Sequence, residues 1–355
     1  MKRVLRSKEP VRLRDIAEEA GVAIPTVSQI LNGHAREKRI RPETERDVRG
    51  IAKQMGYKTN LAAKSLVTKR SMAVGILVPN LGESYYPAIM AQLHRKVRQK
   101  GYLLIFANHY LDPKLFWEEI AALTQRSVDA LLLGPVPRMP GGVRKIRELA
   151  GRYPVIAFDW ADSEIDSIQN CPQSMGYAAA DYIRSKGVRH VLEVAHLSKH
   201  DERLLGLPSH AGSRLRAFEE RLAQQAGAKI RRTRWLLSNF EEGEHILRKS
   251  IESGKFESFD GMFFPQKSVA EFFAHELLQC GKNLSSYVAI VISGGTLHSY
   301  LRRSLSVLHQ NPLDIADKIA VRLFARINDP TRPPVLVNLA AQLQERQFSV
   351  CHASL

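Results

Sequence analysis

The sequence predicts an α/β protein in which a small all-α head of three helices precedes a larger body of two doubly wound lobes. Three observations predict this arrangement. The chain has 355 residues, enough for two or three domains. Apolar residues follow a helical period up to residue 57, and from Met72 onward short apolar runs alternate with amphipathic stretches. The positive charge is concentrated near the amino terminus.

The formal net charge of +16 is unevenly spread along the chain. Residues 1–70 hold 17 Lys and Arg against 8 Asp and Glu, whereas residues 71–355 hold 35 against 28. The first fifth of the chain therefore carries more than half of the excess. Such an asymmetry is typical of a nucleic-acid-binding head on a larger body.

Composition also limits the compartment and the class of protein. Three widely separated cysteines, Cys171, Cys280 and Cys351, exclude a disulfide scaffold and indicate a reducing compartment. No apolar run is long enough for a membrane helix, and the basic amino terminus does not lead into the apolar stretch of a secretory signal. We expect a cytoplasmic protein without membrane contact.

Three helices are predicted in the head. The first covers residues 13–20 and ends at Gly21, which tolerates the positive φ of a tight turn. The second opens at Pro25, where a missing N–H is harmless, and the third starts after Pro42. The apolar residues predicted to lie between them are Leu13, Ile16, Ala17, Ala20, Val27, Ile30, Leu31, Val48, Ile51, Ala52 and Met55. Two short helices across a glycine turn, backed by a third, form a helix-turn-helix.

The run RDIAEEAGVAIPTVSQILNG resembles the helix-turn-helix of the lactose-repressor (LacI/GalR) transcription factors, and the resemblance continues through ETERDVRGIAKQMGY and NLAAKSL. The string AGV, three residues, then TVS and LN is highly specific. In this family the second helix lies in the DNA major groove. The resemblance implies base-reading positions at Ile24, Pro25 and Gln29. It implies phosphate-anchoring positions at Thr26, Ser28 and Asn32.

Two departures from the family pattern bear on the DNA sequence that is read. Ala23 stands where a serine is usual, so one phosphate hydrogen bond is lost. Gln29 stands where Arg or His is frequent, and its amide suits adenine N6 and N7 better than guanine. Ile24 and Pro25 offer only apolar contacts, for example to a thymine methyl. We predict an operator half-site with A·T character opposite Gln29.

The segment after the second helix, GHAREKRI, looks about three residues longer than usual for the family. It holds Arg36 and Lys38, and also Arg39. One interpretation is a solvated charge run. The other is that these cations follow a phosphate backbone and supply salt-sensitive affinity that does not depend on sequence.

The segment NLAAKSL resembles the family's hinge helix, which folds on the operator and wedges a leucine between base pairs in the minor groove. Leu66 matches that leucine, and Asn60 and Lys64 flank it. The alternative for Leu66 is an ordinary core residue between domains. The predicted boundaries are 1–57 for the DNA-binding domain, 58–70 for the hinge and 71–355 for the body.

In the body, apolar runs read as buried parallel strands separated by helices, the pattern of βαβ units. The predicted strands are 72–79, 102–108, 130–136, 154–160, 190–196, 261–265, 288–294 and 334–339. Their order resembles the family's two-lobed effector domain, which has the periplasmic-binding-protein type I fold. We expect the chain to cross between lobes near residues 162–171, 293–297 and 326–334, and a last strand near QERQFS.

In the family a small-molecule effector binds in the cleft between the lobes. The resemblance places eight residues of this chain there: Tyr85, Tyr86, Asp159, Trp160, Arg214, Gln266, Lys267 and Gly294. Two acidic positions of sugar-binding relatives are missing, because Gln266-Lys267 and the segment around Gly294 replace them. Arg214 and Lys267 without those carboxylates favour an anionic ligand, such as a phosphorylated or acidic sugar. The alternative is a cleft that has lost its ligand or is gated differently.

Three classes of function remain: a ligand-responsive dimeric regulator that binds a palindromic DNA operator, a solute-binding protein with the same body, and an enzyme. The absent secretory signal and the basic head disfavour the second class. No Ser/His/Asp or Cys/His arrangement supports the third, and we expect no metal or cofactor. A homodimer is expected because two heads must read two half-sites. The chain leaves no heptad-repeat tail after QERQFS, which disfavours a tetramer.

Overall fold

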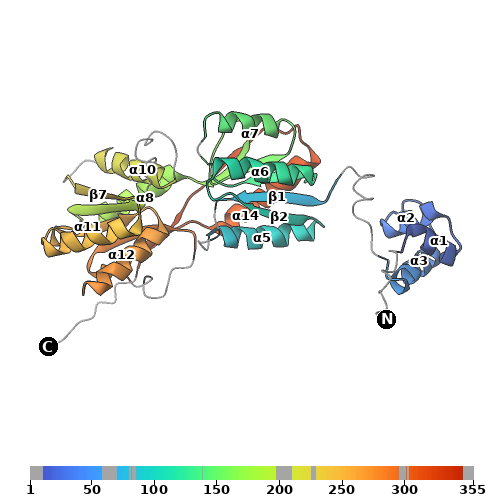
Figure 1. Cartoon of the computed structure of the whole chain (residues 1–355), viewed down its shortest axis with the longest axis horizontal. Helices are drawn as coiled ribbons and strands as arrows, with labels where there is room; N and C mark the ends of the chain where they lie inside the picture. The colour runs from blue at the N-terminus through green and yellow to red at the C-terminus, as the bar shows by residue number, and fades with distance from the viewer. Residues whose placement is uncertain are drawn as a thin grey trace, which may run out of the picture. The chain divides into compact units, whose positions relative to one another are not determined.

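The computed structural model of the chain describes residues 11–57, 70–79, 81, 85–137, 139–196, 210–224, 229–295, 301 and 304–346. Two compact units, Met1–Ser71 and Met72–Leu355, make up the chain (Figure 1), and they are called the head and the body. Among the described residues, no helix is both long and apolar enough to cross a membrane.

The head consists of the three expected helices, α1 (Leu13–Ala20), α2 (Ile24–Leu31) and α3 (Pro42–Gln54). Gly21 follows α1 with φ +63°, the left-handed conformation that turns the chain toward α2. The buried side chains of the head come from all three helices and from the loop after α2: Ile16, Ala17, Val27, Ile30, Ala35, Val48 and Ala52. The helix-turn-helix prediction is confirmed.

Lobe 1 of the body is a six-stranded sheet in the order β11-β5-β4-β3-β1-β2, with parallel neighbours throughout. Its strands are β1 (Ala73–Val78), β2 (Leu103–Asn108), β3 (Ala130–Leu133), β4 (Val155–Phe158), β5 (Asp166–Asn170) and β11 (Leu336–Leu339). Its helices are α5 (Tyr85–Gln99), α6 (Pro113–Gln125), α7 (Gly142–Ala150) and α14 (Pro312–Asn328).

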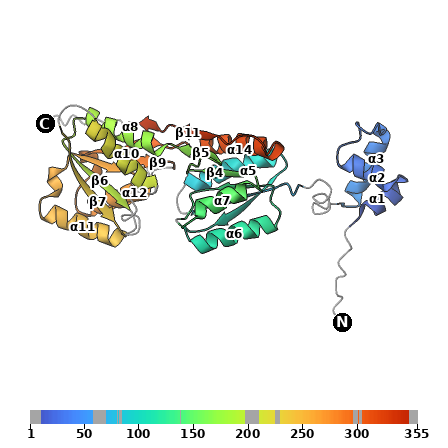
Figure 2. The same ribbon diagram turned by 90° about the horizontal axis from the view of Figure 1, so that it is seen from above.

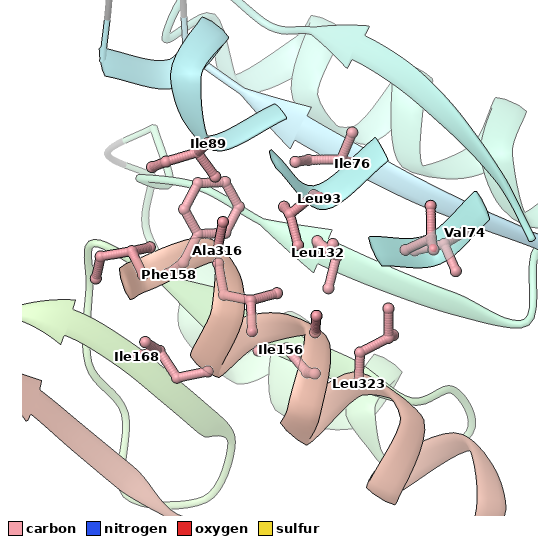
Figure 3. Close-up of a cluster of buried hydrophobic side chains, with 14 of the residues drawn as sticks. Val74, Ile76, Ile89, Leu93, Leu132, Ile156, Phe158, Ile168, Ala316 and Leu323 are labelled. Carbon is pink, nitrogen blue, oxygen red and sulfur yellow. The ribbon is translucent and has the colours of Figure 1, made fainter. Parts of the chain in front are cut away.

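The helices cover both faces of the lobe 1 sheet. On one face, α5 and α14 place Ile89, Leu93 and Leu323 against strand residues such as Ile76 and Ile156 (Figure 3). On the other face, α6 and α7 form a second apolar cluster with the same strands (Figure 2). Helices on both faces of a parallel sheet make lobe 1 doubly wound, as the sequence predicts.

Lobe 2 repeats this architecture with the order β12-β10-β9-β8-β6-β7, in which only β12 runs antiparallel to its neighbour. Its strands are β6 (His190–His196), β7 (Arg231–Leu237), β8 (Gly261–Phe264), β9 (Val288–Ser293), β10 (Ser306–His309) and β12 (Gln342–Gln344). Helices α8 (Pro172–Ser185) and α10 (His210–Gln224) cover one face, and α11 (Phe240–Glu252) and α12 (Lys267–Gln279) the other. Two short 3₁₀ turns, η1 (Phe256–Ser258) and η2 (Leu284–Ser286), lead into β8 and β9.

The chain crosses between the lobes three times, but two crossings lie elsewhere than predicted. The first connects β5 to α8 at residues 170–172, the end of the expected range. The second connects β10 to α14 at 309–312 rather than 293–297, because β9 is followed by another strand of lobe 2. The third connects β11 to β12 at 339–342 rather than 326–334, because α14 and β11 both belong to lobe 1. The last strand of the described residues, β12, ends at Gln344, the first residue of QERQFS, and residues 347–349 of that segment lie outside the described residues.

A buried carboxylate fixes the segment between α14 and β11. Asp166 on β5 accepts hydrogen bonds from Arg322 Nε at 2.7 Å and Arg326 Nε at 2.8 Å, both on α14. It also accepts from the Val335 amide at 2.9 Å. The Asp166 side chain is fully buried, so these three donors replace the water that the carboxylate loses on folding.

Candidate functional site

Helix α2 has one apolar face and one accessible face. Val27 and Ile30 are completely buried against α1 and α3, whereas Ile24 is 45% exposed and Pro25 is also exposed. Thr26, Ser28 and Gln29 are half-buried and Asn32 is exposed. The residues expected to read bases and anchor phosphates therefore keep accessible surface on α2, and the face that packs in the head core is a different one.

Two of the residues expected to anchor phosphates, Ser28 and Asn32, contact each other at the end of α2. Asn32 Nδ2 donates to the Ser28 carbonyl at 2.9 Å and to Ser28 Oγ at 3.3 Å. At the other end, Ala23 occupies the cap position and has no side-chain oxygen to satisfy the first amides of the helix. Helix α2 therefore begins without a side-chain cap.

The loop after α2 is an ordered turn. The His34 amide donates to the Gln29 carbonyl at 2.9 Å, and the Ile40 amide donates to the Ala35 carbonyl at 2.9 Å. Ala35 is 2% exposed and belongs to the core of the head. Arg36 and Lys38, together with Arg39, lie on the exposed side of this turn. The additional residues therefore present their cations from a folded element.

Arg49 is a residue of the head that sequence reasoning missed. It lies on α3, and its Nη2 donates to the carbonyl of Ile30 at 2.8 Å, near the end of α2. Glu45, one turn earlier on α3, accepts from Arg49 Nε at 2.9 Å and holds the guanidinium in place. The i, i+4 spacing of Glu45 and Arg49 was the available signal. The predicted hinge residues Asn60, Lys64 and Leu66 lie outside the described residues.

In the body, three buried polar side chains of lobe 1 meet at the carboxyl ends of its strands. Tyr85 opens α5 after β1, Asp159 follows β4 and Asn170 ends β5. The Tyr85 hydroxyl donates to Asp159 Oδ1 at 2.8 Å and accepts from Asn170 Nδ2 at 2.9 Å. Asn170 was not predicted, because the polar strand that carries it was not recognised.

This cluster, Tyr85–Asp159–Asn170, is electrostatically unusual. Burial raises the pKa of Asp159 to about 6, although the Tyr85 hydrogen bond and the Arg214 charge oppose the rise. Burial, followed by the neighbouring Asp159, raises the pKa of the Tyr85 hydroxyl well above its ordinary value. Asp159 Oδ2 and Asn170 Oδ1 are buried without a hydrogen-bond partner in the described part of the chain. Asp159 also has φ +57°, a strained conformation for a non-glycine residue.

Lobe 2 contributes Arg214 and Gly294 to the same place. Arg214 on α10 is 7% exposed, and its Nη1 donates to the Pro265 carbonyl, just after β8, at 2.7 Å. Its charge lowers the pKa of Asp159 in lobe 1. Gly294, just after β9, lies against the Tyr85 ring so closely that a Cβ there would be 2.6 Å from Tyr85 Cε2. The two lobes therefore contact each other at this point.

Gln266 and Lys267 are each engaged within lobe 2. The side-chain amide of Gln266 accepts from the backbone N–H of His196 at 2.8 Å and donates to the His196 carbonyl at 3.1 Å. These two bonds join the carboxyl ends of β8 and β6. Lys267 Nζ lies 3.2 Å from Glu271 Oε1, one turn along α12. Each of the two cations thus has a carboxylate near it: Glu271 pairs with Lys267, and the charge of Arg214 acts on Asp159.

The remaining two predicted site residues are also packing residues. The Tyr86 ring meets Tyr85 edge-on with centroids 5.2 Å apart and Phe158 at 6.4 Å. Trp160 Nε1 donates to the Leu133 carbonyl at 2.9 Å, and its ring packs on the α6–α7 side of lobe 1. All eight predicted residues flank the carboxyl ends of strands. In doubly wound sheets, ligands bind at this edge, where the strand order reverses.

Two family descriptions match this chain. "Bacterial regulatory proteins, lacI family" matches residues 12–60, which include α1 to α3. "Periplasmic binding protein-like domain" matches residues 180–348. The first match covers the helix-turn-helix, and the second covers lobe 2 from within α8 onward together with α14 and β11 of lobe 1.

Individual proteins support both matches. The catabolite repressor/activator of Escherichia coli K12 is 26% identical over 345 residues, 95% of this chain and 98% of that protein. The transcriptional repressor PurR of Klebsiella pneumoniae strain 342 is 27% identical over 183 residues, so the match spans 50% of this chain and about half of that protein's length (52%).

Solved structures share the fold. The lac repressor dimer, bound to operator and the anti-inducer ONPF, aligns with a TM-score of 0.79 at 17% identity over 95% of this chain and 98% of that chain. The Cra regulator of Pseudomonas putida, in complex with fructose 1-phosphate, aligns with a TM-score of 0.62 at 19% identity over 78% of this chain and 99% of that chain.

Proposed function

Because the chain belongs to the lactose-repressor (LacI) family of bacterial transcription regulators, we propose that two copies bind a palindromic operator through α2 and that a small molecule between the two lobes controls the binding. A protein that binds operator DNA would act in the cytoplasm, on the nucleoid. A protein that acts by binding of this kind needs no catalytic residues.

One observation carries the DNA-binding part of the proposal. The head buries Val27 and Ile30 and leaves Ile24, Pro25 and Gln29 accessible on a single short helix. A helix with this division fits the major groove with its polar and small apolar side chains toward base edges. Arg36 and Lys38 on the ordered turn would neutralise phosphates beside it.

We propose the domain boundaries 1–57, 58–70 and 71–355. Residues 58–70 would act as a hinge, in which Leu66 wedges between base pairs and Asn60 and Lys64 contact the backbone. A segment this short is not stable as an isolated helix, so its folding would depend on the operator. Effector binding would then act on DNA affinity through the hinge.

We propose a sugar or an anionic sugar derivative as the effector. Arg214 and Lys267 flank the end of β8, and Tyr85, Asp159 and Gly294 form the opposing contact between the lobes. The Pseudomonas putida regulator that shares this fold was solved with fructose 1-phosphate, an anionic sugar. An anion of this kind would pair with Lys267 in place of Glu271, which lies on the same helix.

The effector would act by changing how the lobes meet. In the described structure, Gly294 of lobe 2 touches the Tyr85 ring of lobe 1, so a ligand between them requires a different separation of the lobes. A ligand that binds one separation more tightly shifts the population toward it. If the ligand-bound separation of the lobes favours folding of the hinge, the ligand would strengthen DNA binding. If it disfavours folding of the hinge, the ligand would release the protein from DNA.

The DNA-binding proposal is tested by selection from a random-sequence duplex library with the full-length protein. We expect enrichment of a palindrome with two half-sites. The variant Gln29→Ala should keep the palindrome and its spacing but lose preference at one position in each half-site, at about 1–3 kcal/mol. Recovery of unrelated sequences by the wild-type protein would refute operator recognition.

The effector proposal is tested by titration calorimetry with fructose and fructose 1-phosphate. We expect the phosphate ester to bind more tightly, and Lys267→Gln to weaken it by roughly 10- to 100-fold through loss of a charged hydrogen bond. Lys249→Gln, an exposed lysine of lobe 2, is the matched control and should leave the affinity unchanged. Tighter binding of the neutral sugar would refute the anionic ligand.

A further inference from the structure

The chain enters the body at Met72, between the ends of two helices. The Met72 carbonyl accepts from the Leu103 amide at 2.8 Å, just after α5, and the Met72 amide donates to Asp129 Oδ2 at 3.0 Å, just after α6. Because the lobe 1 strands are parallel, the helices that connect them all end at the edge where the strands begin. The carboxyl ends of α5 and α6 therefore lie on either side of the chain's point of entrance.

Four exposed cations surround this point: Arg95, Arg98, Lys100 and Arg126, here called the junction patch. Arg95 is held by the Gln92 side-chain oxygen at 2.6 Å, and Arg126 Nη1 donates to the Ala122 carbonyl at 2.8 Å. In the described part of the chain, no carboxylate forms an ion pair with any of the four, although the charge of Arg95 contributes to the lowered pKa of Asp317. The adjacent Asp129 accepts the Met72 amide, and the adjacent Asp317 is paired with Lys96 at 3.1 Å.

The helix dipole stabilises cations near a helix carboxyl end, such as Arg98 in the last turn of α5 and Arg126 at the C-cap of α6. It does not explain why the four cations outnumber the two acids beside them. An exposed group of like charges attracts a polyanion and is costly without one. The polyanion expected near the body is the DNA that the head binds. Residues 58–69 connect the DNA-binding unit to Arg70 and can span roughly 40 Å at most.

We propose that the junction patch binds the phosphate backbone of duplex DNA that flanks the operator, as a second DNA-contacting surface in the body. The inference rests on the proposed operator binding and extends it beyond the head. In a homodimer each copy would present one patch, so DNA on both sides of the palindrome would be contacted. These contacts would add affinity without adding sequence preference.

The salt dependence of binding gives the expected size. Each phosphate contact contributes about 0.9 to the slope of log K against log salt concentration. Removal of three contacts from each copy, and thus of six per dimeric complex, would lower the slope by about 5.4. Between about 50 and about 200 mM salt, the loss of affinity would then be roughly 1,800-fold smaller than for the wild-type protein.

The experiment compares two duplexes that carry the same selected palindrome, one of about 20 bp and one of about 50 bp with flanks on both sides. Operator affinity of the full-length protein is measured over a series of salt concentrations by fluorescence anisotropy. The test variant is Arg98→Ala/Lys100→Ala/Arg126→Ala. The matched control, Lys229→Ala/Lys249→Ala/Lys255→Ala, removes the same charge from exposed positions of lobe 2.

We expect the wild-type protein and the control to bind the long duplex more tightly and with a steeper salt slope than the short one, and the test variant to lose this difference. On the short duplex all three proteins should bind alike, which also shows that the variants are folded. Equal behaviour of test and control variants on the long duplex would overturn the inference. Failure of the wild-type protein to bind even the short duplex would instead overturn the proposed function and this inference with it.

Discussion

The buried Asp159 predicts a specific pH dependence of stability. The pKa of this carboxyl rises from its ordinary value of 3.8 to about 6 in the folded body. The folded state therefore holds the Asp159 proton more tightly than the unfolded chain. The resulting stability is fully present below pH 3.8 and is lost as the pH rises through about 6. At about 1.4 kcal/mol per pKa unit, the loss amounts to about 3 kcal/mol.

The substitution Asp159→Asn removes the titrating group and keeps an oxygen that can accept from the Tyr85 hydroxyl. Relative to this variant, the wild-type body should lose about 3 kcal/mol of unfolding free energy between pH values of about 4 and about 7.5. Urea unfolding followed by tryptophan fluorescence measures this directly. All three tryptophans, Trp117, Trp160 and Trp235, lie in the body, so the signal does not report on the head.

Glu118→Gln is the matched control, because it removes one exposed carboxylate from α6. Its unfolding free energy should follow the wild-type pH profile. If the profiles of wild type and Asp159→Asn run parallel across this range, the buried, strained carboxyl does not have the environment described, and the reasoning about the contact between the lobes fails.

Three further substitutions test other parts of the structure. Ile30→Ala should cost the head about 2–5 kcal/mol, because Ile30 is fully buried; operator binding measured by anisotropy should fall while the tryptophan-detected unfolding of the body stays unchanged, and intact binding would contradict this. Asp166→Ala should cost the body about 3–5 kcal/mol in urea unfolding by removing the buried carboxylate that pairs with the half-buried Arg322 and Arg326; a change below about 1 kcal/mol would contradict it. Gly294→Ala should cost about 1–3 kcal/mol in the same assay, because the new methyl group overlaps the Tyr85 ring; an unchanged midpoint would show that the lobes do not meet there.

The fold of the head and most of the strands could be predicted because their signals are local. Apolar residues at helical spacing define α1 to α3, and apolar runs define β1, β6 and β9, whose side chains are mostly buried on both faces. The strands that were missed, β5, β7, β10 and β12, are short, polar or at a sheet edge. In β5 and β10 the buried polar residues have distant hydrogen-bond partners, whereas the residues of β12 are all exposed.

Strand β5 illustrates the difficulty. Its sequence DSIQN has one large apolar residue, yet Asp166, Ser167 and Asn170 are all buried. Asp166 depends on arginines more than 150 positions later in the chain, and Asn170 on Tyr85. Strand β7 is also hard to predict from its sequence, because one of its polar residues, Arg234, pairs with the buried Glu193 of β6.

The candidate site between the lobes could be approached only through family resemblance. Tyr85, Asp159 and Arg214 were placed by matching motifs, and nothing local in the sequence indicates that they face one another. The misplaced crossings have the same origin, because β10 and α14 are assigned to a lobe by packing contacts and not by their own composition. Long-range pairing, rather than helix or strand propensity, sets the limit of the prediction.

Helix α2 is proposed to read DNA through its accessible face, and substitution of Gln29 gives the sharpest test of this role. Half-sites are selected from the same random library with the wild-type protein and with Gln29→Arg, and the selected sequences are compared position by position. We expect an A·T pair at one position of the half-site for the wild-type protein. For the variant we expect G·C at that position, because arginine pairs with guanine O6 and N7. Identical half-sites for both proteins would contradict it.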